Sequence, residues 1–111
     1  MITTLGEANE EGTYIVTAVF TDESAIALIP TVITWSLRDE NGVIVNNRSA
    51  VAISVPAASV SIVLSGNDLI YSNTQTKRIL TIEATYTSTY GTGLPLKDEC
   101  EIPICNLYGV S

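Results

Sequence analysis

The side chains that could carry out chemistry in this sequence are two cysteines and several carboxylates, and no histidine accompanies them. A cysteine nucleophile needs a neighbouring base, and histidine is both the usual base and the commonest protein ligand of transition metals. Cys100 and Cys105 lie in one predicted strand, in which Cys100 faces the core beside Ile102 and Cys105 lies on the opposite side or at the strand end. Two thiols on opposite sides cannot complete a zinc site with Glu99 or Glu101. We therefore expect neither a catalytic residue nor a metal site here.

The spacing of the two cysteines also bears on whether they form a disulfide. Residues five positions apart in a strand have Cα atoms about 16 Å apart, whereas a disulfide requires a separation below about 7 Å. We expect free thiols, which favours assembly in a reducing cytosol. A local turn at Pro103 is the alternative that would bring Cys100 and Cys105 together.

Three groups of carboxylates lie at predicted turns and strand ends, namely Asp22-Glu23, Asp39-Glu40, and Asp98-Glu99 with Glu101. Loop carboxylates bind Ca²⁺ in some proteins, and the segment from Asp39 to Gly42 resembles a fragment of a calcium loop, but the later ligands of that motif are absent. Glycoside hydrolysis needs two carboxylates that flank a cleft, and a small domain with short turns offers little cleft. We interpret these groups as solvated turns and expect no cofactor.

The charge of the chain limits its partners. Its 111 residues carry a net charge of −7, and the five basic residues are scattered. Nucleic acids and anionic membrane surfaces both require clustered cations, so we expect neither as a partner. The uncharged stretch at residues 49–67 alternates Ser with Val and Ile and contains Pro56, which is unlike a membrane-spanning helix. No signal peptide is visible in residues 1–12.

Apolar and polar residues alternate in six runs, which begin near Tyr14, Val32, Val51, Ser59, Leu80 and Glu99. This period of two is typical of antiparallel strands with one buried and one solvated face. With a shorter run at residues 43–46, it predicts about seven strands in an all-β fold, an antiparallel two-sheet sandwich of the immunoglobulin-like kind. Residues 13–111 form the predicted domain, after a polar lead-in at residues 1–12 with a short strand at residues 2–5. The inward positions give the predicted core: Val16, Phe20, Ile33, Trp35, Leu37, Ile53, Ile62, Leu64, Leu80, Ile82 and Ile102.

Turn signals separate these runs. Asn41-Gly42 is a strong signal for a hairpin turn because both residues tolerate positive φ. Gly91-Thr92-Gly93 predicts a mobile loop whose tip carries Tyr90, and an exposed aromatic side chain at such a tip can anchor a partner. We take Tyr90 and Thr92 as candidate partner-binding residues. The alternative is a solvent-exposed loop tyrosine with no binding role.

Trp35 resembles the buried tryptophan of strand C in immunoglobulin-like domains, although the cysteine pair of antibody domains is absent. The chain more closely resembles small immunoglobulin-like proteins encoded among the structural genes of tailed bacteriophages and prophages. The segments that carry this resemblance are residues 32–39, 41–46, 63–69, 78–86 and 94–99, and together they span most of the chain from Tyr14 onward. The cysteines of the last strand depart from the family pattern.

The resemblance implies a virion-associated protein, a head or tail accessory without catalytic residues, located in the virion or in the bacterial cytoplasm during assembly. Its expected partners are proteins of the larger assembly, contacted through loop tips or an unpaired edge strand. A homo-oligomer is the default for such a component. The competing hypothesis is an adhesin or carbohydrate-binding module in which Tyr90 and neighbouring loops contact sugar.

Overall fold

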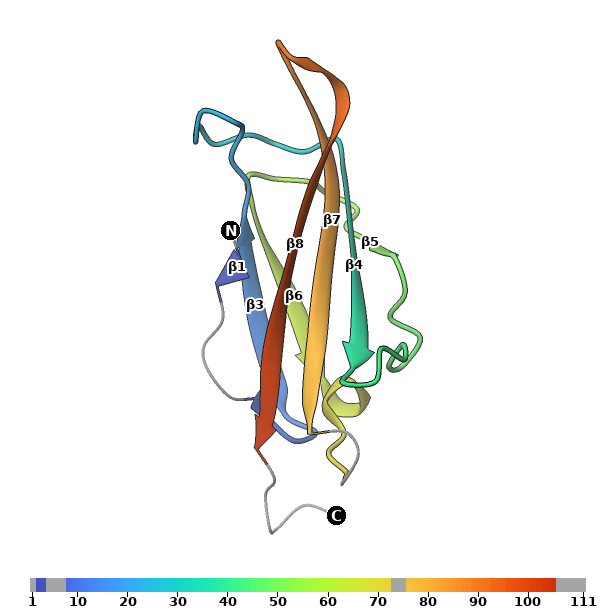
Figure 1. The fold of residues 1–111 in the computed structure, drawn as a ribbon. Helices are drawn as coiled ribbons and strands as arrows, with labels where there is room; N and C mark the ends of the chain where they lie inside the picture. The colour runs from blue at the N-terminus through green and yellow to red at the C-terminus, as the bar shows by residue number, and fades with distance from the viewer. Residues whose placement is uncertain (1, 4–7, 73–75, 106–111) are drawn as a thin grey trace.

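The computed structural model describes residues 2–3, 8–72 and 76–105, and this part of the chain contains only β-strands and one short 3-10 helix (Figure 1). The prediction of an all-β protein is therefore confirmed. The elements in chain order are β1 (Ile2–Thr3), β2 (Ala8–Asn9), β3 (Thr13–Val19), β4 (Val32–Asp39), β5 (Val51–Ala52), β6 (Ser59–Ser65), η1 (Gly66–Leu69), β7 (Lys77–Ser88) and β8 (Gly91–Cys105).

The strands form two sheets, one of three strands in the order β1-β3-β6 and one of five in the order β2-β8-β7-β4-β5. All pairs are antiparallel except β2 with β8, which run parallel. The larger sheet is thus mixed, which corrects the purely antiparallel prediction. The reason lies in the segment treated above as a lead-in: β1 pairs with β3 in one sheet, and β2 crosses to the edge of the other. Leu5, the end of the predicted first strand, lies outside the described residues.

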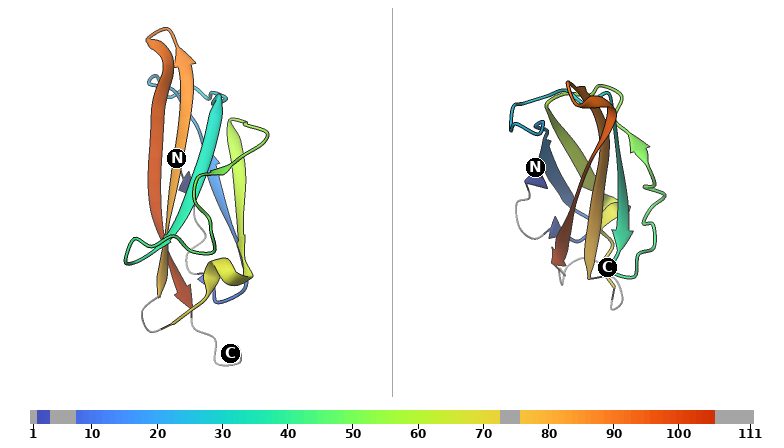
Figure 2. Two further views of the ribbon diagram at one scale, coloured as in Figure 1. Left: turned by 90° about the vertical axis from the view of Figure 1, so that its right-hand side faces the viewer. Right: turned by 45° about the horizontal axis from the view of Figure 1, so that its top comes forward.

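The two sheets lie as layers that share one apolar core (Figure 2). The alternation of apolar and polar residues along the strands produces this core, because β3, β6 and the first part of β7 bury every second residue. All the predicted core side chains are buried except Ile53, which is half-buried against the same cluster. Each fully buried aliphatic side chain stabilises the fold by about 1.5–3 kcal/mol.

The segment between β4 and β6 departs from its predicted strands. The chain does turn at Asn41-Gly42, where Gly42 has φ +82°, but the predicted strand at residues 43–46 is reduced to one bridge between Ile44 and Arg38. The strand predicted from Val51 is only two residues long. Positive φ angles at Asn46, Asn47 and Ala50 interrupt the extended backbone that alternation assumes.

The two longest strands, β7 and β8, form a hairpin whose tip projects beyond the other strands of both sheets (Figure 1). The molecule accordingly measures 52 × 23 × 21 Å along its principal axes. Gly91 and Gly93, predicted to lie in a loop, belong to β8. Tyr86 pairs with Leu94 and Ser88 pairs with Gly91, so β8 has one residue more than β7 between these pairs. The bulge therefore lies in β8, where Gly93 has φ +66°.

Candidate interaction site at the tip of the β7–β8 hairpin

The loop at residues 20–31, between β3 and β4, folds back on itself beneath the hairpin tip. Asp22 Oδ1 accepts the backbone N–H groups of Ser24 at 2.8 Å and of Ile26 at 3.0 Å. Thr21 and Ala27 form an antiparallel bridge at the base of the turn. A short side chain that bonds its own backbone in this way is typical of aspartate-initiated turns. The turn leaves the side chain of Ile26 63% exposed.

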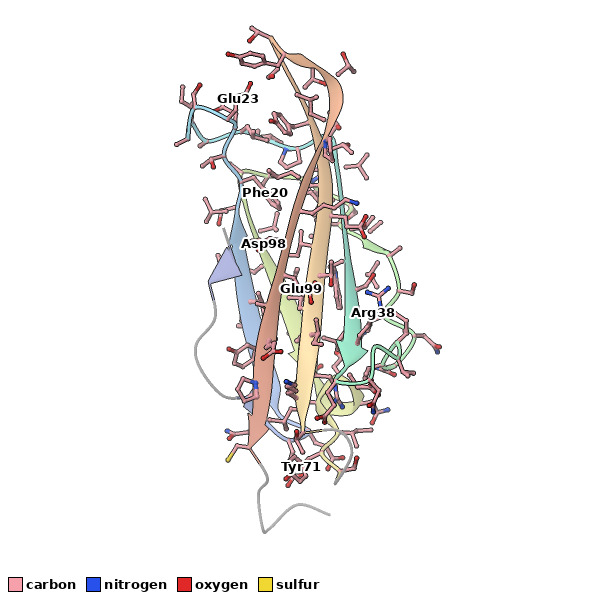
Figure 3. The ribbon with its side chains drawn as sticks, viewed as in Figure 1. Phe20, Glu23, Arg38, Tyr71, Asp98 and Glu99 are labelled. Atoms are coloured by element: carbon pink, nitrogen blue, oxygen red, sulfur yellow. The ribbon has the colours of Figure 1, made fainter. Side chains whose placement is uncertain are left out.

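Glu23 ties this loop to the hairpin (Figure 3). Its Oε2 accepts the hydroxyl of Tyr86 at 3.2 Å, and its Oε1 accepts the hydroxyl of Ser88 at 2.8 Å. Desolvation against the loop, then the hydrogen bond to Glu23 and the charges of Glu23 and Asp22, raises the pKa of Tyr86. A second attachment joins the backbone N–H of Thr31 to the carbonyl of Thr85 at 2.8 Å. Loop and hairpin therefore form one structural unit.

The tip of the hairpin is a two-residue turn that presents Tyr90. The backbone N–H of Tyr90 donates to Ser88 Oγ at 3.1 Å, while its side chain is 78% exposed. A shallow depression of about 360 Å³ lies beside it, lined by Glu23, Ser24, Tyr86, Tyr90 and Leu94. The tip thus offers an exposed aromatic ring beside a carboxylate that is already held in place.

Other exposed apolar side chains come from the loops at this end. The loop at residues 20–31 and the loop at residues 53–58 both reach the end of the molecule that bears the hairpin (Figures 1 and 2). They contain Ile26, Ile29 and Val55, which are 63%, 67% and 76% exposed. Exposed aromatic and aliphatic side chains at one end of a molecule are of the kind that form the centre of protein–protein interfaces.

The structure brings Tyr90 together with Glu23 and Tyr86, and it places Thr92 in an exposed position near the start of β8. Sequence reasoning missed the role of Glu23, which it treated as one of a pair of solvated carboxylates. The Asp22-Glu23-Ser24 sequence does signal a turn. It carries no signal for the contact with Tyr86, which lies 63 residues further along the chain.

A buried polar cluster lies at the other end of the molecule, around Asp68 in η1. The carboxylate of Asp68 accepts hydrogen bonds from Asn46 Nδ2, Arg48 Nε and the backbone N–H of Ser65, at 2.9, 2.9 and 3.1 Å. Burial alone would raise the pKa of Asp68, but these hydrogen bonds outweigh it, and the pKa is lowered. Arg78, itself fully buried, donates from Nε to the Asp68 carbonyl at 2.8 Å. The cluster fastens η1 to the sheets and presents no unsatisfied group.

Both cysteines are free thiols, as their spacing predicts. Cys100 packs partly buried against the core. Burial, followed by the charges of Asp98 and Glu99, raises the pKa of Cys100 to about 11. The thiol is therefore protonated at neutral pH and is a poor nucleophile.

The predicted solvated turn at Asp39-Glu40 needs correction. Asp39 is only 3% exposed, and its Oδ1 accepts the backbone N–H groups of Asn41 at 2.8 Å and Val43 at 3.1 Å. Glu40 Oε1 accepts the backbone N–H of Thr76 at 2.7 Å. The correction applies to Asp39, which is buried and holds the turn in shape through the N–H groups of Asn41 and Val43, whereas Glu40 stays exposed.

Within the described ranges, no three His, Cys, Asp or Glu side chains come together in a group that could hold a metal ion. Over the same residues, the structure contains no helix with the length and apolar character needed to span a membrane. In the comparison with known proteins, no family model matches this chain, and no curated protein or solved structure matches it significantly.

Proposed function

We propose that this chain is a non-enzymatic, immunoglobulin-like interaction domain that binds a protein partner in a larger assembly through the tip of its β7–β8 hairpin. The observation that carries the proposal is Tyr90, which is 78% exposed at the end of a hairpin fixed by Glu23. Tyrosine is enriched among the residues that dominate binding energy. A side chain presented on a fixed scaffold loses less conformational entropy when it binds, which favours affinity.

The strand order supports the immunoglobulin-like part of the proposal. In that fold strands A, B and E lie in one sheet, and strands C, F and G are neighbours in the other. Here β1-β3-β6 follow the first order and β4-β7-β8 the second, with Trp35 on the strand that corresponds to C. The correspondence is partial, because among the described residues no strand occupies the place of D, and β5 pairs with β4 instead.

Placement in a phage or prophage virion rests on the sequence resemblance of residues 32–39, 41–46, 63–69, 78–86 and 94–99. These segments form β4, its following turn, the end of β6 with η1, and most of the β7–β8 hairpin. They are therefore the scaffold that carries the tip. A head or tail accessory protein that binds through this tip is the role that the resemblance and the exposed site support together.

Binding rather than catalysis is also favoured by the state of the reactive side chains. The thiol of Cys100 is protonated at neutral pH because its pKa is raised to about 11. Asp39 and Asp68 are buried and accept hydrogen bonds from within the fold. Glu23 holds the loop to the hairpin.

The proposal is tested by measuring binding to each head and tail protein encoded beside this gene, with the wild-type chain and with Tyr90→Ala. We expect one of them to bind and the variant to weaken binding by about 30-fold, the effect of losing a dominant interface residue. Tyr71→Ala is the matched control, since Tyr71 lies at the opposite end of the molecule (Figure 3). Binding that is equally strong in all three proteins would remove Tyr90 from the interface.

The carbohydrate-binding alternative is resolved by a glycan array. Specific sugar binding that disappears in Tyr90→Ala and persists in Tyr71→Ala would favour an adhesin or carbohydrate-binding module, because aromatic rings beside carboxylates also suit sugars. Protein binding without any sugar binding on the array supports the assembly role.

A further inference from the structure

Strand β6 is the edge of the three-stranded sheet and pairs on one side only, with β3. Its sequence, Ser-Val-Ser-Ile-Val-Leu-Ser, contains no charge, no proline and no glycine. Natural proteins usually protect such an edge with a charged residue, a proline, a bulge or a very short strand. None of these devices is present in β6.

The hydrogen-bond register identifies the open backbone groups of β6. At one end of the β3–β6 pair Phe20 N–H donates to the Ala58 carbonyl at 2.8 Å, and at the other Gly66 N–H donates to the Gly12 carbonyl at 3.1 Å. In an antiparallel pair, hydrogen-bonded and non-bonded positions alternate. The residues of β6 that bond to β3 are therefore Val60, Ile62 and Leu64.

The intervening residues Ser59, Ser61 and Val63 direct their N–H and carbonyl groups away from β3. Ser65 lies two residues after Val63, so its backbone groups point in the same direction. Its N–H donates to Asp68 Oδ2 at 3.1 Å, which confirms that these groups point away from β3. No hydrogen bond from the described part of the chain reaches the backbone of the other three. Their side chains are exposed as well.

The outer face next to this edge is uncharged. Ile15 and Val19 on β3 and Val63 on β6 are 44%, 41% and 53% exposed, and the outward positions between them are threonines and serines. By contrast, the part of β8 that does not pair with β2 carries prolines and charges, at Pro95, Lys97, Asp98, Glu99, Glu101 and Pro103. In a chain with net charge −7, β6 is therefore an edge that a second copy can approach without meeting like charge.

We propose that two copies of this chain pair through their β6 strands, antiparallel and about a two-fold axis at Ser61. Ser61 would lie opposite Ser61 of the second copy, Ser59 opposite Val63 of the second copy, and Val63 opposite Ser59 of the second copy. These three hydrogen-bonded pairs exchange about six backbone hydrogen bonds. The two three-stranded sheets then join into one continuous sheet of six strands.

A second copy suits this edge because the arrangement is self-complementary. The two-fold axis places every open donor and acceptor of β6 against its counterpart, and every facing side-chain pair is uncharged. The β7–β8 tip belongs to the other sheet and stays free. Since the β6 strands are antiparallel, the two tips point in opposite directions, and the pair can engage two partner molecules.

The test measures self-association of the whole chain by sedimentation equilibrium, in the wild type and in Ser61→Lys and Thr92→Lys. We expect wild type and Thr92→Lys to form a species of twice 11.8 kDa. Ser61→Lys should weaken that association by at least about tenfold, because it places like charges opposite each other. Both lysine variants lower the net negative charge equally, so general repulsion cannot explain a difference between them.

Engineered cysteines test the register. In a Cys100→Ala, Cys105→Ser background, Ser61→Cys should form an intermolecular disulfide under oxidising conditions, since facing Cα atoms in a bonded pair lie about 5.5 Å apart. Ser59→Cys is the control, because the Cα atoms of the two copies of residue 59 would lie about 14 Å apart. A monomeric wild type overturns the proposal. So does a dimer that Ser61→Lys leaves intact and Ser61→Cys does not cross-link.

Discussion

Arg48 donates a hydrogen bond from Nε to Oδ1 of the fully buried Asp68 at 2.9 Å. The same guanidinium lies 5.7 Å from the ring centroid of Trp35. Arg48 thus connects the irregular segment after β4 both to η1 and to the core tryptophan. Arg48 is therefore expected to stabilise the fold.

Replacing Arg48 with alanine should destabilise the fold by about 1–3 kcal/mol, because the carboxylate of Asp68 stays buried without its cation. The cost is below that of a fully buried pair, since the Arg48 side chain is 37% exposed and water can replace part of the contact. Urea unfolding measures the difference. Arg38→Ala removes the same charge from β4 and should change the free energy of unfolding by less than about 0.5 kcal/mol. Equal effects of the two substitutions would contradict this role.

Asp68 should also give the protein an acid-sensitive stability. The pKa of its carboxyl is lowered in the fold from the ordinary 3.8. A group with a lowered folded pKa stabilises the protein above its unfolded pKa, and this contribution is lost as the pH falls below 3.8 toward the folded value. The free energy of unfolding in Asp68→Asn should therefore depend less on pH in that window than in the wild type. A pH dependence in Asp68→Asn that is identical to that of the wild type would refute the assignment.

Glu23→Ala should loosen the hairpin tip without unfolding the protein. The substitution removes the acceptor for the hydroxyls of Tyr86 and Ser88, and with it both side-chain bonds from Glu23 to the hairpin. Amide hydrogen exchange should quicken around residues 86–94 and stay unchanged in β3 and β6. The pKa of Tyr86 should fall toward its usual value, since the hydrogen bond and the charge of Glu23 both help to raise it. Exchange at the tip that is no faster than in Glu99→Ala would show that Glu23 does not hold it.

Cys100 should react slowly with iodoacetamide. In a Cys105→Ser protein the rate at pH 8 should be about a hundredfold below that of the urea-unfolded chain, because only the thiolate reacts and burial raises the pKa to about 11. The rate should keep rising about tenfold per pH unit up to about pH 10, because the pKa lies near 11. A rate that levels off between about pH 9 and pH 10 would mean that the thiol ionises as readily as a free cysteine.

Some strands and their buried faces could be predicted from the sequence alone. The alternation from Tyr14 to Phe20 and from Leu80 to Ala84 identifies strands and their buried faces, because in these stretches burial follows strand periodicity without interruption. Trp35 is buried on β4 for the same reason. All-β structure and most of the core could therefore be predicted.

The errors occur where local backbone conformation or distant contacts decide the outcome. Asn46 and Ala50 adopt positive φ, which alternation cannot reveal, and the predicted strands around them are short or missing. Gly91 and Gly93 have the composition of a loop but lie in a bulged strand. Tyr90 could be named from its position at a tip, whereas the role of Glu23 depends on a contact that forms only when the two sheets are assembled.

We propose the β7–β8 tip, together with the loop at residues 20–31, as the partner-binding surface. Hydrogen exchange, or nuclear magnetic resonance shifts, should be compared for the whole chain alone and with any head or tail protein that the binding measurements identify as a partner. We expect changes confined to residues 22–32 and 86–94. Changes confined to β6, or to the end around Asp68 and Tyr71, would contradict the claim.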